Sequence, residues 1–151
     1  MQKFLKREKI KIRKVSLKDT MFLYNIYNQN VKDNNFFTNK KLDYSEHKLW
    51  LKNNIKKNII FICYNKHKLG YVRFDRIKFK NFKISIAIKN SHKNKGIGKF
   101  LLFKSLKKIK LDKFNIYAKI KRSNYASKKF FLSCNFKFVK QNKYMLKYIN
   151  D

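Results

Sequence analysis

Hydrophobic and polar residues alternate along several stretches of the chain, as they do in β-strands with one buried face. Ile10 to Val15 largely alternates, which predicts a first strand. The apolar run from Asn58 to Tyr64 predicts a buried strand. Alternation from Leu69 to Ile77 and from Phe82 to Ile88 predicts two antiparallel strands, and Asn65 to Lys68 is the hairpin turn that precedes them.

Apolar residues recur at helical spacing elsewhere in the chain. Ser16 is placed to cap a first helix, with Asp19 where a capping box carries its acid, and Ser45 is placed to cap a second. The polar, irregular segment from Asn28 to Leu42 between them predicts a loop or a broken helix. The second helix is expected from Glu46 to about Lys56. The apolar faces comprise Met21, Phe22, Ile26 and Tyr27 in the first helix, and Leu49, Trp50 and Ile55 in the second.

The second half of the chain adds two helices and three strands. The expected helices run from Gly96 to about Lys110 and from Asn124 to Cys134, and the expected strands from Phe114 to Ile120, from Phe136 to Val139 and from Tyr144 to Tyr148. The order β-α-α-β-β-β-α-β-α-β-β predicts an α/β fold, with a mixed sheet covered by helices on both faces. Because no repeat or linker interrupts it, we expect one domain over residues 10–151, with residues 1–9 as a basic N-terminal extension.

The charge balance is extreme, with 40 Lys and Arg against 8 Asp and Glu and a formal net charge of +32. Such a charge attracts polyanions at long range, so a nucleic-acid partner has to be considered. The lysines, however, are spread through every segment and are not gathered in one stripe or tail. Together with frequent Asn, Ile, Phe and Tyr and the absence of Pro, this favours a drift in amino-acid usage over a nucleic-acid function.

The two cysteines, Cys63 and Cys134, lie far apart and follow no metal-ligand spacing, so we expect small core residues and no metal. Charged residues interrupt the first 14 positions too often for a signal peptide. No stretch approaches the ~20 apolar residues that span a membrane. These features predict a cytoplasmic protein without a membrane partner.

The most informative segment is a basic turn between the strand that ends at Ile88 and the next helix. Gly96 and Gly98 stand at the start of that helix, although the chain has only three glycines. The first turn of a helix presents free backbone N–H groups and partial positive charge, and glycine lets a phosphate approach them closely. Lys93, Lys95 and Lys99 add positive charge around it. The pattern predicts a diphosphate site; its simpler alternative is a glycine turn that only caps the helix.

Two stretches of the chain resemble motifs of the GNAT acetyltransferases. His92 to Gly98 is similar to motif A, (Gln/Arg)-x-x-Gly-x-(Gly/Ala), with Lys93 in the basic slot. Asn124 to Phe131, followed by Cys134 to Phe136, is similar to the motif B helix and the strand after it. The resemblance covers nearly the whole chain. It implies the GNAT fold, with a V-shaped splay between the fourth and fifth strands, and transfer of an acetyl group from acetyl-CoA to a primary amine.

The same resemblance implies where acetyl-CoA binds. Its pantetheine arm would pair with the fourth strand, where an N–H near Ile86 or Ala87 would polarise the thioester carbonyl. Its pyrophosphate would lie on the amides of the glycine turn, and Asn124 and Ser127 would contact the pantetheine or adenosine side. The implied cofactor-binding residues are Ile86, Ala87, Ile88, Lys93, Lys95, Gly96, Ile97, Gly98, Lys99, Asn124 and Ser127.

The resemblance does not identify the catalytic base and acid as clearly as it identifies the cofactor site. The family's frequent base, a Glu on the fourth strand, is Lys83 here, and its frequent acid, a Tyr in motif B, is Phe131. Glu46 and Asp75 remain among the few carboxylates, and Asp75 and His47 are the candidate catalytic residues. The alternatives are a surface histidine and an aspartate paired with an arginine. Tyr71 and Tyr125 are weaker candidates for the acid.

Residues in the first half of the chain resemble the GNAT enzymes that act on nucleotide-linked amino sugars. The nearest of these acetylate the 4-amino group of a UDP-linked dideoxy sugar on the pseudaminic acid route. The resemblance implies that Trp50 or Phe36 packs on the sugar or base, that Arg73 or nearby lysines hold the diphosphate, and that Asn28 also contacts substrate. Two alternatives stay open: a protein N-terminal amine as acceptor, as in ribosomal-protein acetyltransferases, and a catalytically weakened domain that binds nucleic acid.

Overall fold

The computed structural model describes residues 10–33, 40–109, 114–140 and 143–147. Its helices are α1 (Thr20–Lys32), α2 (Tyr44–Asn54), α3 (Ile97–Ile109) and α4 (Tyr125–Ser133), with short 3-10 turns η2 (Leu17–Asp19) and η3 (Asn90–His92). Its strands are β1 (Lys11–Lys14), β2 (Ile59–Tyr64), β3 (Lys68–Lys78), β4 (Asn81–Ile88), β5 (Asn115–Lys119), β6 (Lys137–Lys140) and β7 (Lys143–Lys147). This is the element order that the sequence predicts.

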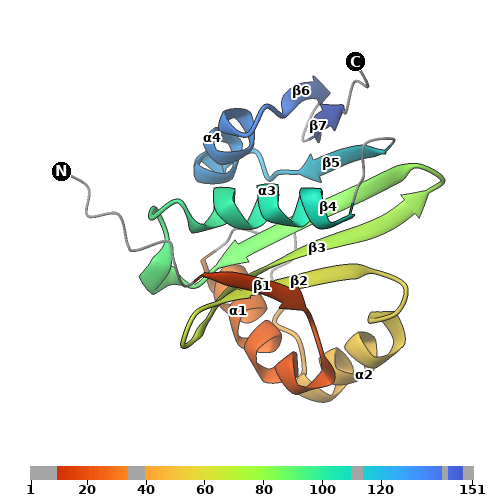
Figure 1. The fold of residues 1–151 in the computed structure, drawn as a ribbon, viewed down its shortest axis with the longest axis vertical. Helices are drawn as coiled ribbons and strands as arrows, with labels where there is room; N and C mark the ends of the chain where they lie inside the picture. Colours follow the sequence, from red (N-terminus) through yellow and green to blue (C-terminus); the bar gives the residue numbers. More distant parts are fainter. Residues whose placement is uncertain (1–9, 34–39, 110–113, 141–142, 148–151) are drawn as a thin grey trace.

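The strands form one mixed sheet of seven, in the order β1-β2-β3-β4-β5-β7-β6. Every neighbouring pair is antiparallel except β4 and β5, which run parallel. A parallel pair needs a crossover connection, and α3 supplies it. In Figure 1, α1 and α2 lie together on one side of the sheet and α3 on the other. The predicted α/β fold with a mixed sheet is therefore confirmed.

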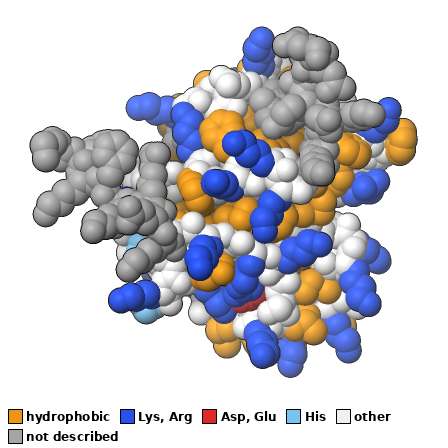
Figure 2. Space-filling view, viewed as in Figure 1, with side chains coloured by type: hydrophobic (Ala, Val, Ile, Leu, Met, Phe, Trp, Pro, Cys, Tyr) orange, Lys and Arg blue, Asp and Glu red, His pale blue; other side chains and the backbone are white. Residues whose placement is uncertain are grey.

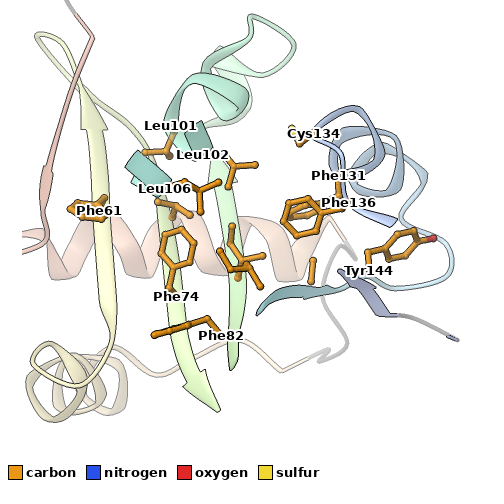
Figure 3. Packing of buried hydrophobic residues seen from close by; sticks show 14 of the residues in the cluster. Phe61, Phe74, Phe82, Leu101, Leu102, Leu106, Phe131, Cys134, Phe136 and Tyr144 are labelled. Carbon is orange, nitrogen blue, oxygen red and sulfur yellow. The ribbon is translucent and has the colours of Figure 1, made fainter. Parts of the chain in front are cut away.

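Alternation along the central strands divides the core into two layers. Phe61, Val72 and Phe74 are buried on the side of α3, while Ile62 and Tyr71 are buried on the side of α1 and α2. Figure 3 shows the larger layer, in which Phe74 and Phe82 of the sheet lie near Leu102 and Leu106 of α3. Cys63 and Cys134 are buried in this layer as free thiols, as expected.

Helices α1 and α2 differ from the sequence prediction in their bounds and buried faces. Helix α1 continues past Asn28 to Lys32, so the first residues of the segment expected to be a loop or a broken helix are helical. The α2 cap is Asp43, whose carboxylate accepts hydrogen bonds from the N–H groups of Ser45 (3.0 Å) and Glu46 (3.2 Å). The helix therefore begins at Tyr44, before the predicted start at Glu46, and Ser45 is not the cap. The buried faces are Leu23, Ile26 and Val31 in α1 and His47 and Leu51 in α2, while Met21 and Leu49 are exposed.

Asp19 joins three elements at the edge of this half of the molecule. Its side chain is fully buried and pairs with Arg13 of β1 and Lys68 of β3, both at 2.8 Å. It also accepts a hydrogen bond from the N–H of Ser16 at 2.8 Å, as the predicted capping box requires. Burial alone would raise the pKa of Asp19, but the hydrogen bonds from Arg13 and Lys68 outweigh it and hold that pKa well below its ordinary value.

None of the helices in the described part of the chain is long and apolar enough to cross a bilayer. Within the same residues, no group of three His, Cys, Asp or Glu side chains is arranged to hold a metal ion.

Candidate active site

Strands β4 and β5 separate after a short stretch of pairing. Their parallel register covers three residue pairs, from Asn81–Asn115 to Lys83–Tyr117. From Ile84 onward the β4 backbone therefore faces a gap where a neighbouring strand would continue the ladder. This is the splay between the fourth and fifth strands that the family resemblance implies.

A cavity of about 680 Å³ occupies the splay and passes through the sheet. Its end nearest the glycine turn, here called the turn end, is lined by residues just before α3 and in its first turn, including Lys93, Gly96, Gly98 and Lys99. Its α1 end lies on the opposite side of the sheet and is lined by Tyr27, Asn30, Tyr71, Arg73, Lys83, Ser85 and Lys119. The middle is lined by β4 from Ile84 to Ile88. A long ligand can therefore reach from one face of the sheet to the other.

The two glycines of the turn serve different purposes. Gly96 has a φ of +78°, which is costly for most other residues, and no heavy atom lies within 4 Å of the position a Cβ would take. Its backbone therefore borders open space at the N-terminus of α3, where free amides can meet an anion. A Cβ on Gly98 would lie 3.2 Å from the Phe130 ring of α4. The absence of a side chain there also allows α3 and α4 to pack closely, a reason the sequence did not reveal.

The lysines of the turn are also divided in their roles. Lys93 and Lys99 line the cavity. The ammonium group of Lys95 instead donates a hydrogen bond to the Ser91 carbonyl at 3.2 Å, and Lys95 does not line the cavity. Of the eleven residues expected to bind the cofactor, Lys95 is the one outside the cavity wall.

Helix α4 forms the wall opposite β4. The side chain of Asn124 caps it and accepts a hydrogen bond from the N–H of Ser127 at 3.1 Å. Both residues line the cavity, together with Phe130 and Phe131. Phe131 is buried, and the position where the resemblance would place a tyrosine therefore carries no hydroxyl.

Arg73 and Asp75 form an ion pair on the face of β3 toward the α1 end. The guanidinium Nε lies 3.0 Å from one oxygen of Asp75 and donates a hydrogen bond to the other at 3.1 Å. Arg73 lines the cavity and Asp75 does not. Asp75 stands beside Lys83 in the sheet register, and Lys83 beside Tyr117. Burial and the Asp75 charge raise the pKa of Tyr117.

The other three side-chain candidates from the first half of the chain lie outside the main cavity. His47 and Trp50 line a separate, much smaller cavity, and the Arg73 guanidinium lies 5.0 Å from the centre of the Trp50 ring. Asn28 exchanges hydrogen bonds with the backbone of Leu42, its carbonyl oxygen accepting from the N–H at 2.9 Å. Phe36, the alternative to Trp50, lies outside the described residues.

Sequence reasoning missed several residues at the α1 end of the cavity. Tyr27 and Asn30 come from α1, and Ser85 and Lys119 come from the two splayed strands. The spacing of Tyr27 and Asn30 by one helical turn toward the buried side was a usable signal. Lys119 carried none, because it is one lysine among many.

Comparison with known proteins identifies the family of the chain that forms this cavity. Residues 22–136 match the model of the acetyltransferase (GNAT) family, which is well over half of the chain. The chain belongs to the GNAT family. No match is found among curated protein sequences. The match of family and fold makes the chain an acetyl-CoA-dependent N-acetyltransferase.

Solved structures share this fold at low sequence identity. The yncA protein of Salmonella typhimurium, described as an acetyltransferase with its cofactor acetyl-CoA, has a TM-score of 0.82 at 17% identity, covering 95% of this chain and 96% of that one. An N-acetyltransferase from Staphylococcus aureus has 0.79 at 23% identity, covering 93% and 99%. A ribosomal-protein-alanine N-acetyltransferase from Brucella melitensis has 0.76 at 19% identity, covering 90% and 96%.

The residues present fit acetyl-CoA. The cavity is open at a helix N-terminus whose Gly96 backbone borders free space, and two lysines stand beside it. Acetyl-CoA supplies an acetyl group activated as a thioester. The protein has to hold that thioester in the splay, present an N–H to its carbonyl oxygen, and bring a neutral amine to it.

Proposed function

We propose that this enzyme acetylates the amine of an anionic small molecule, namely the 4-amino group of a UDP-linked amino-dideoxy sugar. The observation that carries the proposal is the charge of the main cavity. Its described lining includes Arg73, Lys83, Lys93, Lys99 and Lys119 and not one carboxylate. A cavity of this kind attracts an acceptor that carries phosphate and repels one that is itself polycationic.

Acetyl-CoA is proposed to bind along the turn end and β4. The N–H groups from Ile97 to Lys99 would donate hydrogen bonds to the diphosphate at the start of α3, because helix N-termini bind anions through free N–H groups. The pantetheine arm would follow β4 from Ile86 to Ile88, where pairing with β5 has ended. An N–H near Ile86 or Ala87 would stabilise negative charge on the thioester oxygen. Acetyl-CoA use also supports a cytoplasmic location.

Lys83 and Lys119 are proposed to hold the phosphates of the acceptor. They stand on the two splayed strands at the α1 end, and neither forms an ion pair with a carboxylate of the described residues. Lys83 occupies the position where family members often have a glutamate. The exchange replaces a negative charge by a positive one next to the acceptor, so it changes which amines are attracted.

Arg73 is proposed to contact the acceptor directly, with Trp50 and Asp75 fixing its orientation. The guanidinium lies between the Asp75 carboxylate and the Trp50 ring. Such a cation–π contact contributes ~0.5–2 kcal/mol and limits the positions the side chain can take. Asn28 would act at a distance, by attaching Leu42 to α1.

Two other functions are outcomes of the test. A protein N-terminal amine would need the cavity to accept a peptide. A nucleic-acid role would need a continuous basic surface, but Figure 2 shows Lys and Arg side chains scattered over the visible face among apolar and neutral ones.

The test is the rate of acetyl-CoA turnover with four acceptors: the UDP-linked 4-amino sugar, the same sugar without UDP, an alanine-terminated peptide, and spermidine. The proposal predicts the highest kcat/KM for the UDP-linked sugar, with a higher KM once UDP is removed. A preference for spermidine or the peptide would overturn it. Stabilisation by RNA, with none by CoA, would favour the nucleic-acid alternative.

A further inference from the structure

His47 is a buried histidine that the proposed function leaves unused. It lies on the inner face of α2 and is only 5% exposed. Its Nε2 atom has no hydrogen-bond partner among the described residues. The ring stacks on Trp50 with 6.0 Å between ring centres. An unpaired buried nitrogen costs about 1–3 kcal/mol, so a partner or a purpose is expected.

A small cavity lies beside this histidine. It measures about 10 Å³ and is lined by Leu23, Tyr27, His47, Trp50, Ile60, Tyr71 and Arg73. That volume is about what one water molecule requires, and a buried water needs polar neighbours such as an imidazole nitrogen, a phenol and a guanidinium. A water here would give the Nε2 atom the partner it lacks.

The small cavity and the main cavity share a wall. Tyr27, Tyr71 and Arg73 line both of them. His47 is therefore separated from the acceptor end of the active site by one layer of side chains. Tyr71 is central to that layer, because it is deeply buried on β3 and carries a hydroxyl that can both accept and donate a hydrogen bond.

We propose that His47 is the final acceptor of the proton that the substrate amine must lose, and that Tyr71 and one water in the small cavity connect the two. The ammonium nitrogen gives its proton to the Tyr71 hydroxyl, which passes its own proton to the water, which passes one to Nε2 of His47. Tyr71 and the water end unchanged, the amine becomes neutral and His47 becomes imidazolium. The proposal rests on the transferase activity, whatever the acceptor.

The surroundings of His47 favour a neutral ring before the reaction. Burial lowers its pKa, and the charge of Arg73 lowers it further. The groups that face it are Tyr24 and Tyr27 from α1 and Tyr71 and Arg73 from β3. A backbone contact with Thr20 acts in the opposite direction and raises the pKa. The relay requires the neutral ring to carry its proton on Nδ1. Nε2 then presents its lone pair to the small cavity.

Nitrogen NMR of the histidine side chains tests the geometry without any acceptor. The expected spectrum has His47 in the Nδ1–H form at pH 7, with magnetisation transfer from a bound water to its ring. His67, exposed on the β2–β3 turn, serves as the reference for an ordinary histidine. An Nε2–H form, or the absence of any water signal at His47, would overturn the proposal even if the acceptor assigned above is correct.

Kinetics separate a proton acceptor from a merely structural histidine. We expect His47→Gln to lower kcat about 10²-fold with the UDP-linked 4-amino sugar, a loss in the range typical of removing a general base. The acid limb of its pH profile should move up to the pKa of the substrate amine, because only the neutral amine would then react. Hydroxylamine is already neutral at pH 7 and needs no base, so its acetylation should stay unchanged. His67→Gln is the matched control and should leave both rates unaltered.

Equal losses with both amines, or no loss with either, would contradict the relay. Tyr71→Phe keeps the buried ring and removes the hydroxyl, so it should reproduce the selective loss. It carries the test if His47→Gln does not fold, as judged by its melting temperature. If the wild type acetylates hydroxylamine but not the UDP-linked sugar, the proposed acceptor is wrong and the NMR result still decides the relay.

Discussion

The two ends of the main cavity differ in whether backbone or side-chain groups line them. The turn end presents mainly backbone: a helix N-terminus, and a Gly96 held at a φ of +78°. The α1 end presents side chains from α1, β3, β4 and β5, among them Asn30, Arg73, Lys83 and Lys119. Backbone recognition needs one local sequence and is shared across a family. Side-chain recognition can change residue by residue, so this is where a family member differs in its acceptor.

The largest predicted effect is on the half of the molecule that carries the α1 end. Asp19→Asn would leave Arg13 and Lys68 without their carboxylate and is expected to lower the free energy of unfolding by about 2–3 kcal/mol. The loss is smaller than for a fully buried ion pair because both cationic side chains are partly exposed. The measurement is urea denaturation. Lys107→Gln, on the exposed side of α3, is a control that should change little.

The same carboxylate gives the fold a pH dependence. The folded pKa of Asp19 is lowered, so its contribution is fully present above the ordinary carboxyl pKa near ~4 and is lost as the pH falls below it. Wild type and Asp19→Asn should therefore approach each other in stability at acid pH. A constant difference between them down to pH 3 would contradict the role given to this carboxylate.

The next largest effect is expected from substitution of Gly96, which should weaken CoA binding at the turn end only. Gly96→Val places a β-branched residue at a positive φ, which costs about 1–3 kcal/mol, so the Kd for CoA should rise about 10-fold or more. Gly96→Asn is the matched control, because asparagine tolerates this backbone region better, and it should lose less. Calorimetric titration with CoA measures both. Equal Kd values in the two variants would show that backbone conformation at Gly96 is not what matters.

A charge change should alter the α1 end and leave the turn end as it is. Lys83→Glu is expected to raise the KM for the UDP-linked sugar about 10-fold and to leave the Kd for CoA within about 2-fold, because it removes one phosphate contact. Lys107→Glu carries the same charge change away from the cavity and controls for net charge. If Lys83→Glu weakened CoA and the sugar alike, the two ends would not be separable.

The smallest effect is expected at Trp50. Trp50→Phe keeps an aromatic ring under Arg73 but weakens the cation–π contact, so the KM for the acceptor should rise about 2- to 3-fold with kcat nearly unchanged. Initial rates at varied acceptor concentration give this value. A large fall in kcat instead would assign Trp50 to the chemistry itself.

The two ends of the main cavity also differ in how far the sequence could predict them. The anion site at the turn could be proposed from the sequence, because two glycines and flanking lysines lie within seven residues of one another and the signal is local. The order of helices and strands along the chain was predictable from hydrophobic periodicity. The α2 cap was misplaced, because Asp43 and Ser45 are both good caps and only the observed bonds to Ser45 and Glu46 decide between them.

The α1 end could not be assembled from the sequence. Lys83 and Lys119 are 36 positions apart and look like any other lysine in a chain with 40 Lys and Arg. His47 was selected as a titratable residue, but its burial behind Tyr71 and Arg73 depends on how α2 packs on the sheet. Such juxtapositions arise from tertiary packing and leave no periodic signal in one sequence.

The most direct test of the account is a crystal structure of the enzyme with CoA and UDP bound together. The account predicts the CoA diphosphate on the amides at the start of α3, its pantetheine arm along β4 through the splay, and the UDP phosphates beside Lys83 and Lys119 at the opposite end. A diphosphate bound away from Gly96, or UDP bound outside the cavity, would contradict it.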